Sequence, residues 1–109
     1  MANTFKLKTK ANVGVTTVGI YTAPAATTTV VIGITMANTS GSGVNVGVGI
    51  TRAGTTEDVK LLKNAPIPQG SSLEFMAGNK GVLEATDTVT VDSDTNNSVD
   101  AALTIMEIT

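Results

Sequence analysis

The 109-residue sequence has no cysteine, no histidine and no tryptophan, and only one tyrosine and two phenylalanines. Without cysteine the chain forms no disulfide and offers no thiolate to a metal ion. Without histidine it lacks imidazole metal ligands and the general base of a Ser-His-Asp triad. Because aromatic rings supply much of the burial in most cores, aliphatic side chains must fill this one. We therefore expect a thin core that gains stability from neighbouring subunits.

Long apolar runs are also absent. No stretch approaches membrane-spanning length, and the first residues, Met-Ala-Asn-Thr-Phe-Lys, contain no apolar signal-peptide core. We therefore expect a protein that is made in a cytosol and has no membrane partner. A sequence pI of about 4.8 and the scarcity of aromatic residues argue against nucleic acid as a partner. The length fits a single domain over residues 1–109.

No motif supplies catalytic chemistry in place of the missing histidine. The acidic residues fall in expected turns or at alternating strand positions, a pattern that does not pair carboxylates for acid–base work. Glycines between residues 41 and 49 alternate with valines, whereas a phosphate-binding loop places its glycines before a helix. We predict no enzymatic activity, no cofactor and no catalytic residue. Gly47 and Gly49 are expected instead to allow another backbone or subunit to approach closely.

Apolar residues alternate on both sides of a Ser/Gly-rich break at residues 38–43. Two sets would each share one strand face: Val30, Ile32, Ile34 and Met36 before the break, and Val44, Val46, Val48 and Ile50 after it. This period of two is typical of half-buried strands, and the break contains residues that tolerate turns. We predict a β-hairpin with an exposed tip at residues 39–43. Its core residues are expected to be Ile32, Ile34, Val46 and Val48.

Similar patterns predict strands along the rest of the chain, at residues 3–10, 15–22, 57–63, 71–76, 82–85, 88–92 and 99–108. Segments 71–76 and 82–85 flank a Gly-Asn-Lys-Gly turn at 78–81, which predicts a second hairpin. The Pro-rich segment 65–70 is expected to cross between sheets, because proline removes a ladder donor. No window shows helical periodicity. The fold class predicted is all-β, a single-domain antiparallel β-sandwich of eight or nine short strands, either jelly-roll or immunoglobulin-like.

Charge is distributed unevenly along the sequence. The first 52 residues carry four basic residues and no acid, whereas the remainder carries three basic residues and nine acids. Lys6, Lys8 and Lys10 alternate with uncharged residues, so they share one face of a strand. Two compatible interpretations remain open. The lysines either protect an edge strand from unwanted pairing or form a basic stripe that docks onto an acidic partner surface, such as an identical subunit.

Residues 92–97, Asp-Ser-Asp-Thr-Asn-Asn, place oxygen ligands at alternate positions, as calcium loops do. The helix–loop–helix form of that loop requires glycine at its sixth place and an acid at its twelfth, which here are Asn97 and Leu103. Asp and Asn also favour turns by hydrogen bonding to their own backbone. We predict a hairpin turn and no metal site, with calcium binding as the alternative.

Several segments are distinctive in combination: residues 21–24 (Tyr-Thr-Ala-Pro), 27–31, 38–40, 67–73, 78–80 and 100–108. In these segments the sequence resembles small virion structural proteins of tailed bacteriophages. The resemblance spans nearly the whole chain. Its motifs correspond to strands and turns, so it transfers no catalytic or binding residue.

The resemblance implies a non-enzymatic part of the virion, a capsid decoration protein that stabilises the head shell. It would be located in the virion, after assembly in the host cytoplasm. Its partners would be the major capsid or other virion proteins and further copies of itself, with a trimer favoured. A neck, tail or fibre-base component is the alternative position. A different class of function, a module that binds carbohydrate on a host surface, also remains open. Sugar sites usually present aromatic platforms, however, and one tyrosine offers little.

Overall fold

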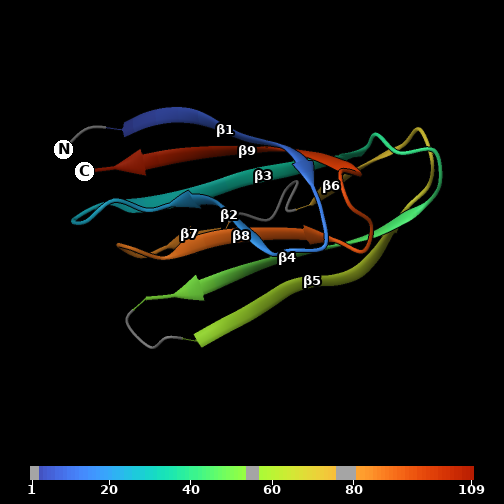
Figure 1. Ribbon diagram of the computed structural model, residues 1–109. Coiled ribbons are helices and arrows are strands. Elements are labelled where there is room, and N and C mark those ends of the chain that lie inside the picture. The colour runs from blue at the N-terminus through green and yellow to red at the C-terminus, as the bar shows by residue number, and fades with distance from the viewer. Residues whose placement is uncertain (1–2, 54–56, 76–80) are drawn as a thin grey trace.

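The computed structural model describes residues 3–53, 57–75 and 81–109, which contain nine strands and no helix (Figure 1). The strands are β1 (Asn3–Val13), β2 (Val18–Thr22), β3 (Thr28–Asn38), β4 (Val44–Arg52), β5 (Glu57–Ile67), β6 (Ser72–Phe75), β7 (Gly81–Leu83), β8 (Thr88–Ser93) and β9 (Val99–Ile108). Over these ranges no helical segment offers the length and apolar character of a membrane crossing. The predicted all-β class is confirmed, although β1, β3 and β5 each extend to 11 residues and are not short.

The strands form two antiparallel sheets. Sheet 1 has the order β1-β9-β3-β6, with β7 also paired to β3, and sheet 2 has the order β2-β8-β4-β5. In Figure 1, β1 lies at one side of the molecule and β5 at the other. Most connections pass from one sheet to the other, so neighbours within a sheet are distant in sequence. This arrangement is that of a jelly roll, which resolves the choice between the two predicted sandwich types.

The predicted hairpin at residues 28–50 is wrong. Its two strands form as expected, but β3 belongs to sheet 1 and β4 to sheet 2. The side chain of Asn38 holds the connection between them. It donates to the carbonyls of Ser42 at 2.8 Å and Ile67 at 3.0 Å and accepts from the amide of Ser40 at 2.9 Å. Alternation identifies a strand but not its partner, and this connection is long enough to change sheet.

The second predicted hairpin is also wrong, because β6 and β7 do not pair with each other. Both run antiparallel to β3, with Phe75 opposite Ile34 and Gly81 opposite Val31. They therefore follow one another along the same edge of sheet 1. The predicted turn lies outside the described residues except for Gly81. The expected crossing between sheets is confirmed, since β5 lies in sheet 2 and β6 in sheet 1, but it begins later than predicted. Residues 65–67, including Pro66, still pair with β4, so only residues 68–71 make the crossing.

Aliphatic side chains between the sheets form the core. The prediction that Ile34, Val46 and Val48 are buried is confirmed. The prediction for Ile32 is wrong, and so is the placing of Val30 on the same face. The pairing of β3 with β9 shifts between Val31 and Gly33, which reverses the alternation. As a result, two earlier residues face the core, Thr29 and Val31.

Candidate functional site

The amino-terminal lysines lie on β1, an edge strand of sheet 1. They stand opposite three buried residues of β9: Lys6 faces Ile105, Lys8 faces Leu103 and Lys10 faces Ala101. Their side chains therefore point to the inner side of the sheet edge. An inward-pointing charge on an edge strand opposes pairing with another strand, which is what the edge-protection interpretation expects.

Lys6 takes part in a buried polar network at this edge. Its Nζ lies 2.9 Å from Oε1 of Glu107, a carboxylate whose side chain is only 8% exposed. The hydroxyl of Tyr21 donates to Oε2 of Glu107 at 2.6 Å and lies 2.8 Å from Oγ1 of Thr29. The network joins β1, β3 and β9 of sheet 1 to β2 of sheet 2. It therefore holds the two sheets together at the β1/β2 edge of the sandwich.

The network shifts the titration of two of its members. Burial, followed by the hydrogen bond to Glu107, raises the pKa of Tyr21 from 10.0 to about 12. The hydrogen bond from Tyr21, followed by that from Lys6, holds the pKa of Glu107 below its ordinary value. Glu107 is therefore the charged acceptor of the network and Tyr21 is its neutral donor.

Lys8 and Lys10 differ from Lys6, because neither forms an ion pair with another residue that the structure describes. Lys8 is half-buried in this inward orientation, whereas Lys10 is exposed. Docking by Lys6, Lys8 and Lys10 stays a prediction.

The outer face of sheet 1 carries an apolar row that the sequence did not reveal. Phe5, Met106, Val30 and Val82 stand opposite one another in register across β1, β9, β3 and β7. Phe5 and Val82, at the two ends of this row, are 69% and 61% exposed. Leu7, the next outward residue of β1, is 65% exposed. Exposed apolar side chains gathered on one face mark an interaction surface.

Sequence reasoning missed this surface for a physical reason. On a typical edge strand the apolar residues of an alternating pattern face the core and the charged residues face water. In β1 this is reversed, because the lysines lie toward the inner side. The signal that could have identified it was the pairing of β1 with β9. That pairing links residues about 100 positions apart, so local patterns do not contain it.

The outer face of sheet 2 is polar, and its glycines make room for an ion pair. Asp92 accepts a hydrogen bond from Thr17 at 3.0 Å, and its carboxylate lies 3.5 Å from Nζ of Lys60. A Cβ at Gly47 would lie 2.6 Å from Oδ1 of Asp92, and one at Gly49 would lie 2.9 Å from the carbonyl of Val59. The close approach predicted for these glycines is therefore met by groups of the same chain.

The hairpin turn predicted at residues 92–97 is wrong, because β8 lies in sheet 2 and β9 in sheet 1, so this oxygen-rich segment connects the two sheets. Asp92 faces Thr17 and Lys60, whereas Oδ1 of Asp94 accepts from the amide of Asn45 at 3.1 Å. The two carboxylates are thus turned to different partners. Within residues 3–53, 57–75 and 81–109, no group of three or more His, Cys, Asp or Glu residues could hold a metal ion.

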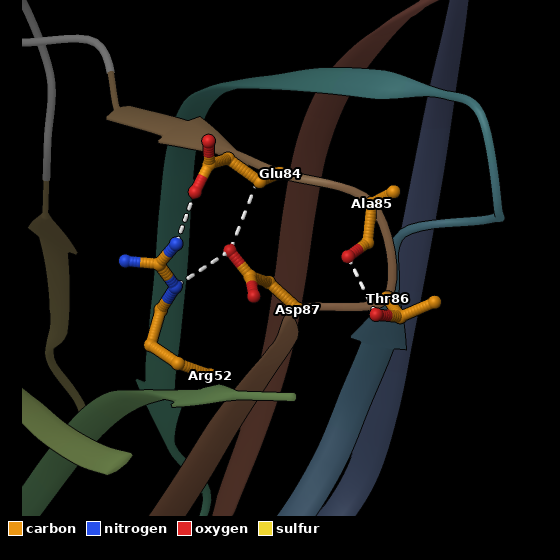
Figure 2. A network of polar contacts seen from close by, with 5 residues as sticks. All are labelled: Arg52, Glu84, Ala85, Thr86 and Asp87. Carbon is orange, nitrogen blue, oxygen red and sulfur yellow. Dashed lines mark hydrogen bonds and ion pairs between the residues drawn. The ribbon is translucent and has the colours of Figure 1, made fainter. Parts of the chain in front are cut away.

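A second ionic cluster closes the turn between β7 and β8 (Figure 2). Arg52 Nε lies 3.0 Å from Oδ2 of Asp87, and its guanidinium also pairs with Glu84. The same Asp87 oxygen accepts the amide of Glu84 at 3.0 Å. Asp87 is buried, so Arg52 supplies the charge that compensates this carboxylate. The cluster holds a turn and leaves no acid free for acid–base chemistry at this point.

No protein-family model and no curated protein sequence matches the chain. Solved structures with the same fold do exist. A chain of the Bacillus endospore appendages, described as disulfide-linked pili, is 16% identical with a TM-score of 0.57, covering 99% of this chain and 87% of its own. A chain of the acid-stable capsid of Helicobacter pylori bacteriophage KHP30 is 10% identical with a TM-score of 0.59, covering 98% and 87%.

A chain of the cyanophage Pam1 capsid asymmetric unit is 13% identical with a TM-score of 0.52, and the match covers 96% of this chain and 83% of that one. At these identities the comparisons establish a shared jelly-roll-like fold. Two of the three similar chains come from phage capsids and one comes from a pilus.

Proposed function

We propose that this protein is a non-enzymatic structural component of a tailed bacteriophage virion, a decoration protein that stabilises the head shell. It acts by binding other proteins, namely the major capsid protein and further copies of itself, as a trimer. It is made in the host cytoplasm and becomes part of the virion there. Residues 1–109 serve as one assembly domain.

The observation that carries this proposal is the fold match to two phage capsid chains. Each match covers nearly all of this chain and more than four fifths of the other. The chemistry of the surface supports the same role. Asp92 and Asp87 are both engaged by neighbouring basic or hydroxyl groups, and the most exposed apolar side chains gather on one sheet face.

A pilus subunit is the competing assembly role, because an endospore appendage chain shares the fold equally well. That appendage is described as disulfide-linked, whereas this sequence contains no cysteine. Copies of this chain therefore need a non-covalent interface to assemble. The resemblance of the sequence to virion proteins and the two capsid matches favour the phage role.

The test is to identify the chain in gradient-purified particles from the source that encodes it. Mass spectrometry should find it in many copies per particle, and particles made without it should lose their genome at lower temperature. A neck, tail or fibre-base position would give a low copy number and heads of unchanged thermal stability. Absence of the chain from purified particles would overturn the proposal.

A further inference from the structure

We infer that two copies of this chain pack face to face through the outer face of sheet 1, around a two-fold axis that runs across the strands. In this pair the apolar row of each copy lies over a hollow lined by small residues of the other. The inference goes beyond the proposed function and does not rest on it, because it follows from the shape, charge and area of one face.

Large apolar side chains protrude at one end of this face. The row of Phe5, Met106, Val30 and Val82 crosses it from β1 to β7. Together with Leu7, the two end residues of the row are the most exposed large apolar side chains of the described chain, at 61–69%. Covering them removes a large apolar area from water, which favours association.

Small residues leave a hollow at the other end of the face. Thr9, Ala102 and Thr35 stand opposite one another across β1, β9 and β3. With Ala11 and Ala37 they line a hollow of about 340 Å³. A face that protrudes at one end and is hollow at the other is complementary to a second copy of itself that runs in the opposite direction.

The row in the middle of the face supplies the axis of the pair. In this row Leu7 and Gly33 both stand opposite Thr104, halfway between the apolar row and the hollow. A two-fold axis above this row places the apolar row of each copy over the hollow of the other, so the same fit occurs twice. Phe5 of one copy then lies over Thr9 of the second copy.

A two-fold axis along the strands gives a poorer fit. It would place large side chains on large ones, with Phe5 over Val82 and Met106 over Val30 of the second copy. The two hollows would face each other at the opposite end and leave unfilled space. Voids forfeit packing contacts, so this arrangement is less stable.

The charges on the face favour the same orientation. Its described part presents two acids, Asp100 and Glu74, and no basic side chain, since Lys10 stands opposite Ala101 and faces the inner side. Both acids lie at the hollow end, where an axis along the strands would bring all four together. With the axis across the strands, the two copies of Asp100 are about 27 Å apart, because this residue is four positions from Thr104 along β9. That separation exceeds the screening length of about 8–10 Å.

The area of the face is sufficient for a stable pair. β1, β9 and β3 are 10 or 11 residues long, and β6 and β7 together occupy a fourth strand position. Four positions about 4.8 Å apart cover roughly 700 Å², close to the roughly 800 Å² per partner of a standard interface. Face-to-face packing covers this whole face, so a second copy of the chain is an occupant of the right size and shape.

Cross-linking of single cysteines tests the pair, because the natural chain has no cysteine. Leu7 lies on the axis, opposite Leu7 of the second copy, and facing sheets are about 10 Å apart. We expect a bismaleimide with a reach of about 10 Å to convert Leu7→Cys protein into covalent dimers. Val15→Cys is the matched control, since Val15 is 55% exposed but lies in the connection between β1 and β2, and this variant should remain monomeric.

A mixture of two single-cysteine proteins tests the orientation. Phe5→Cys and Thr9→Cys should each remain monomeric when treated alone, because each cysteine lies about 13 Å along the face from its own copy. When the two are mixed, with one of them tagged, they should give a covalent dimer of one tagged and one untagged chain. A mixture of Phe5→Cys with Val82→Cys should give none.

Two cross-linking results would overturn the inference. Leu7→Cys protein that cross-links no more than Val15→Cys protein at high concentration would exclude the pair. A product from Phe5→Cys with Val82→Cys, in place of the product from Phe5→Cys with Thr9→Cys, would place the axis along the strands.

Light scattering gives an independent readout. Leu7→Glu should halve the mass of the wild-type assembly, and Val15→Glu should leave it unchanged. The pair alone has a mass of about 22 kDa, two subunits of 11.0 kDa, and falls to one subunit. The trimer of the proposed function needs another surface, so if it also forms, two trimers of about 66 kDa in total should separate into single trimers. An unchanged mass for Leu7→Glu would contradict the pair.

The pair and the proposed function fail separately. A pair formed by a chain that is absent from virions would refute the proposed function alone. A virion protein whose Leu7→Cys variant does not cross-link would refute the pair alone.

Discussion

The hydroxyl of Tyr21 lies 2.6 Å from the carboxylate of Glu107, although 86 residues separate them in the chain. Tyr21 belongs to β2 in sheet 2 and Glu107 to β9 in sheet 1, so this hydrogen bond ties one sheet to the other. Lys6 reaches the same carboxylate from β1. The contact thus closes the β1/β2 side of the sandwich.

The titration of Tyr21 should report this contact, because it is the only tyrosine and the chain has no tryptophan. Its pKa is raised from 10.0 to about 12, so phenolate absorbance should appear near pH 12 in folded protein and near pH 10 in unfolded protein. The raised pKa means that the stabilisation is complete below pH 10 and is lost as the pH rises from 10 to 12. Tyr21→Phe should lose this pH-dependent decline. A folded-state midpoint near pH 10 would contradict the buried hydrogen bond.

The bulge in β3 predicts different costs for two neighbouring isoleucines. Ile34 is 2% exposed, so Ile34→Ala should lower the free energy of unfolding by about 2–5 kcal/mol through lost burial and a residual cavity. Ile32 lies at the bulge on the outer side, and Ile32→Ala should cost about 1 kcal/mol or less. Urea unfolding of both variants measures the difference. Equal losses would mean that Ile32 faces the core as Ile34 does, as simple alternation along the strand predicts.

Loop insertion in the same region provides a further comparison. Four polar residues inserted after Gly41 should cost less than Ile34→Ala, because loop-closure entropy grows slowly with length. Gly41 is exposed and no described atom approaches its Cβ position. A larger loss from the insertion would mean that the 39–43 loop is packed in an interface.

Gly47→Ala tests the ion pair on the outer face of sheet 2. The new methyl group would lie 2.6 Å from Asp92 Oδ1, so we expect a loss of about 1–3 kcal/mol in the free energy of unfolding. Gly41→Ala is the control and should change stability by about 0.5 kcal/mol at most. Introducing Asp92→Ala alongside Gly47→Ala should recover part of the loss. No recovery would show that the backbone, and not the carboxylate, limits this position.

Lys8→Glu combined with Lys10→Glu tests docking while Lys6 keeps its ion pair with Glu107. Because the charge of Lys8 also helps to lower the pKa of Glu107, Lys10→Glu alone is the control for that effect. The fold should remain intact, and association or incorporation into particles should weaken by about tenfold, with a similar weakening of wild type as salt rises. Gly41→Glu with Ser42→Glu adds acids at an exposed loop away from β1 and serves as the charge control. Association of the lysine variant at wild-type strength in low salt would leave edge protection as the only role of these residues.

Local patterns predicted most strands of this fold because period-two alternation is a property of each strand alone. They failed at all three expected hairpins, where the partner of a strand depends on which sheet can bury it. They also failed at Val31, where a single extra residue in β3 reverses the facing of earlier side chains. Local patterns could not predict the apolar row either, because the row exists only when β1, β9, β3 and β7 come into register.

The central claim is that this chain is a structural component of a phage head, and a three-dimensional reconstruction of the particle tests it most directly. The predicted result is a jelly roll of this topology at repeated positions on the outer surface of the head, grouped in threes. Particles whose heads lack this density, or that carry it only at the neck or tail, would contradict the decoration role.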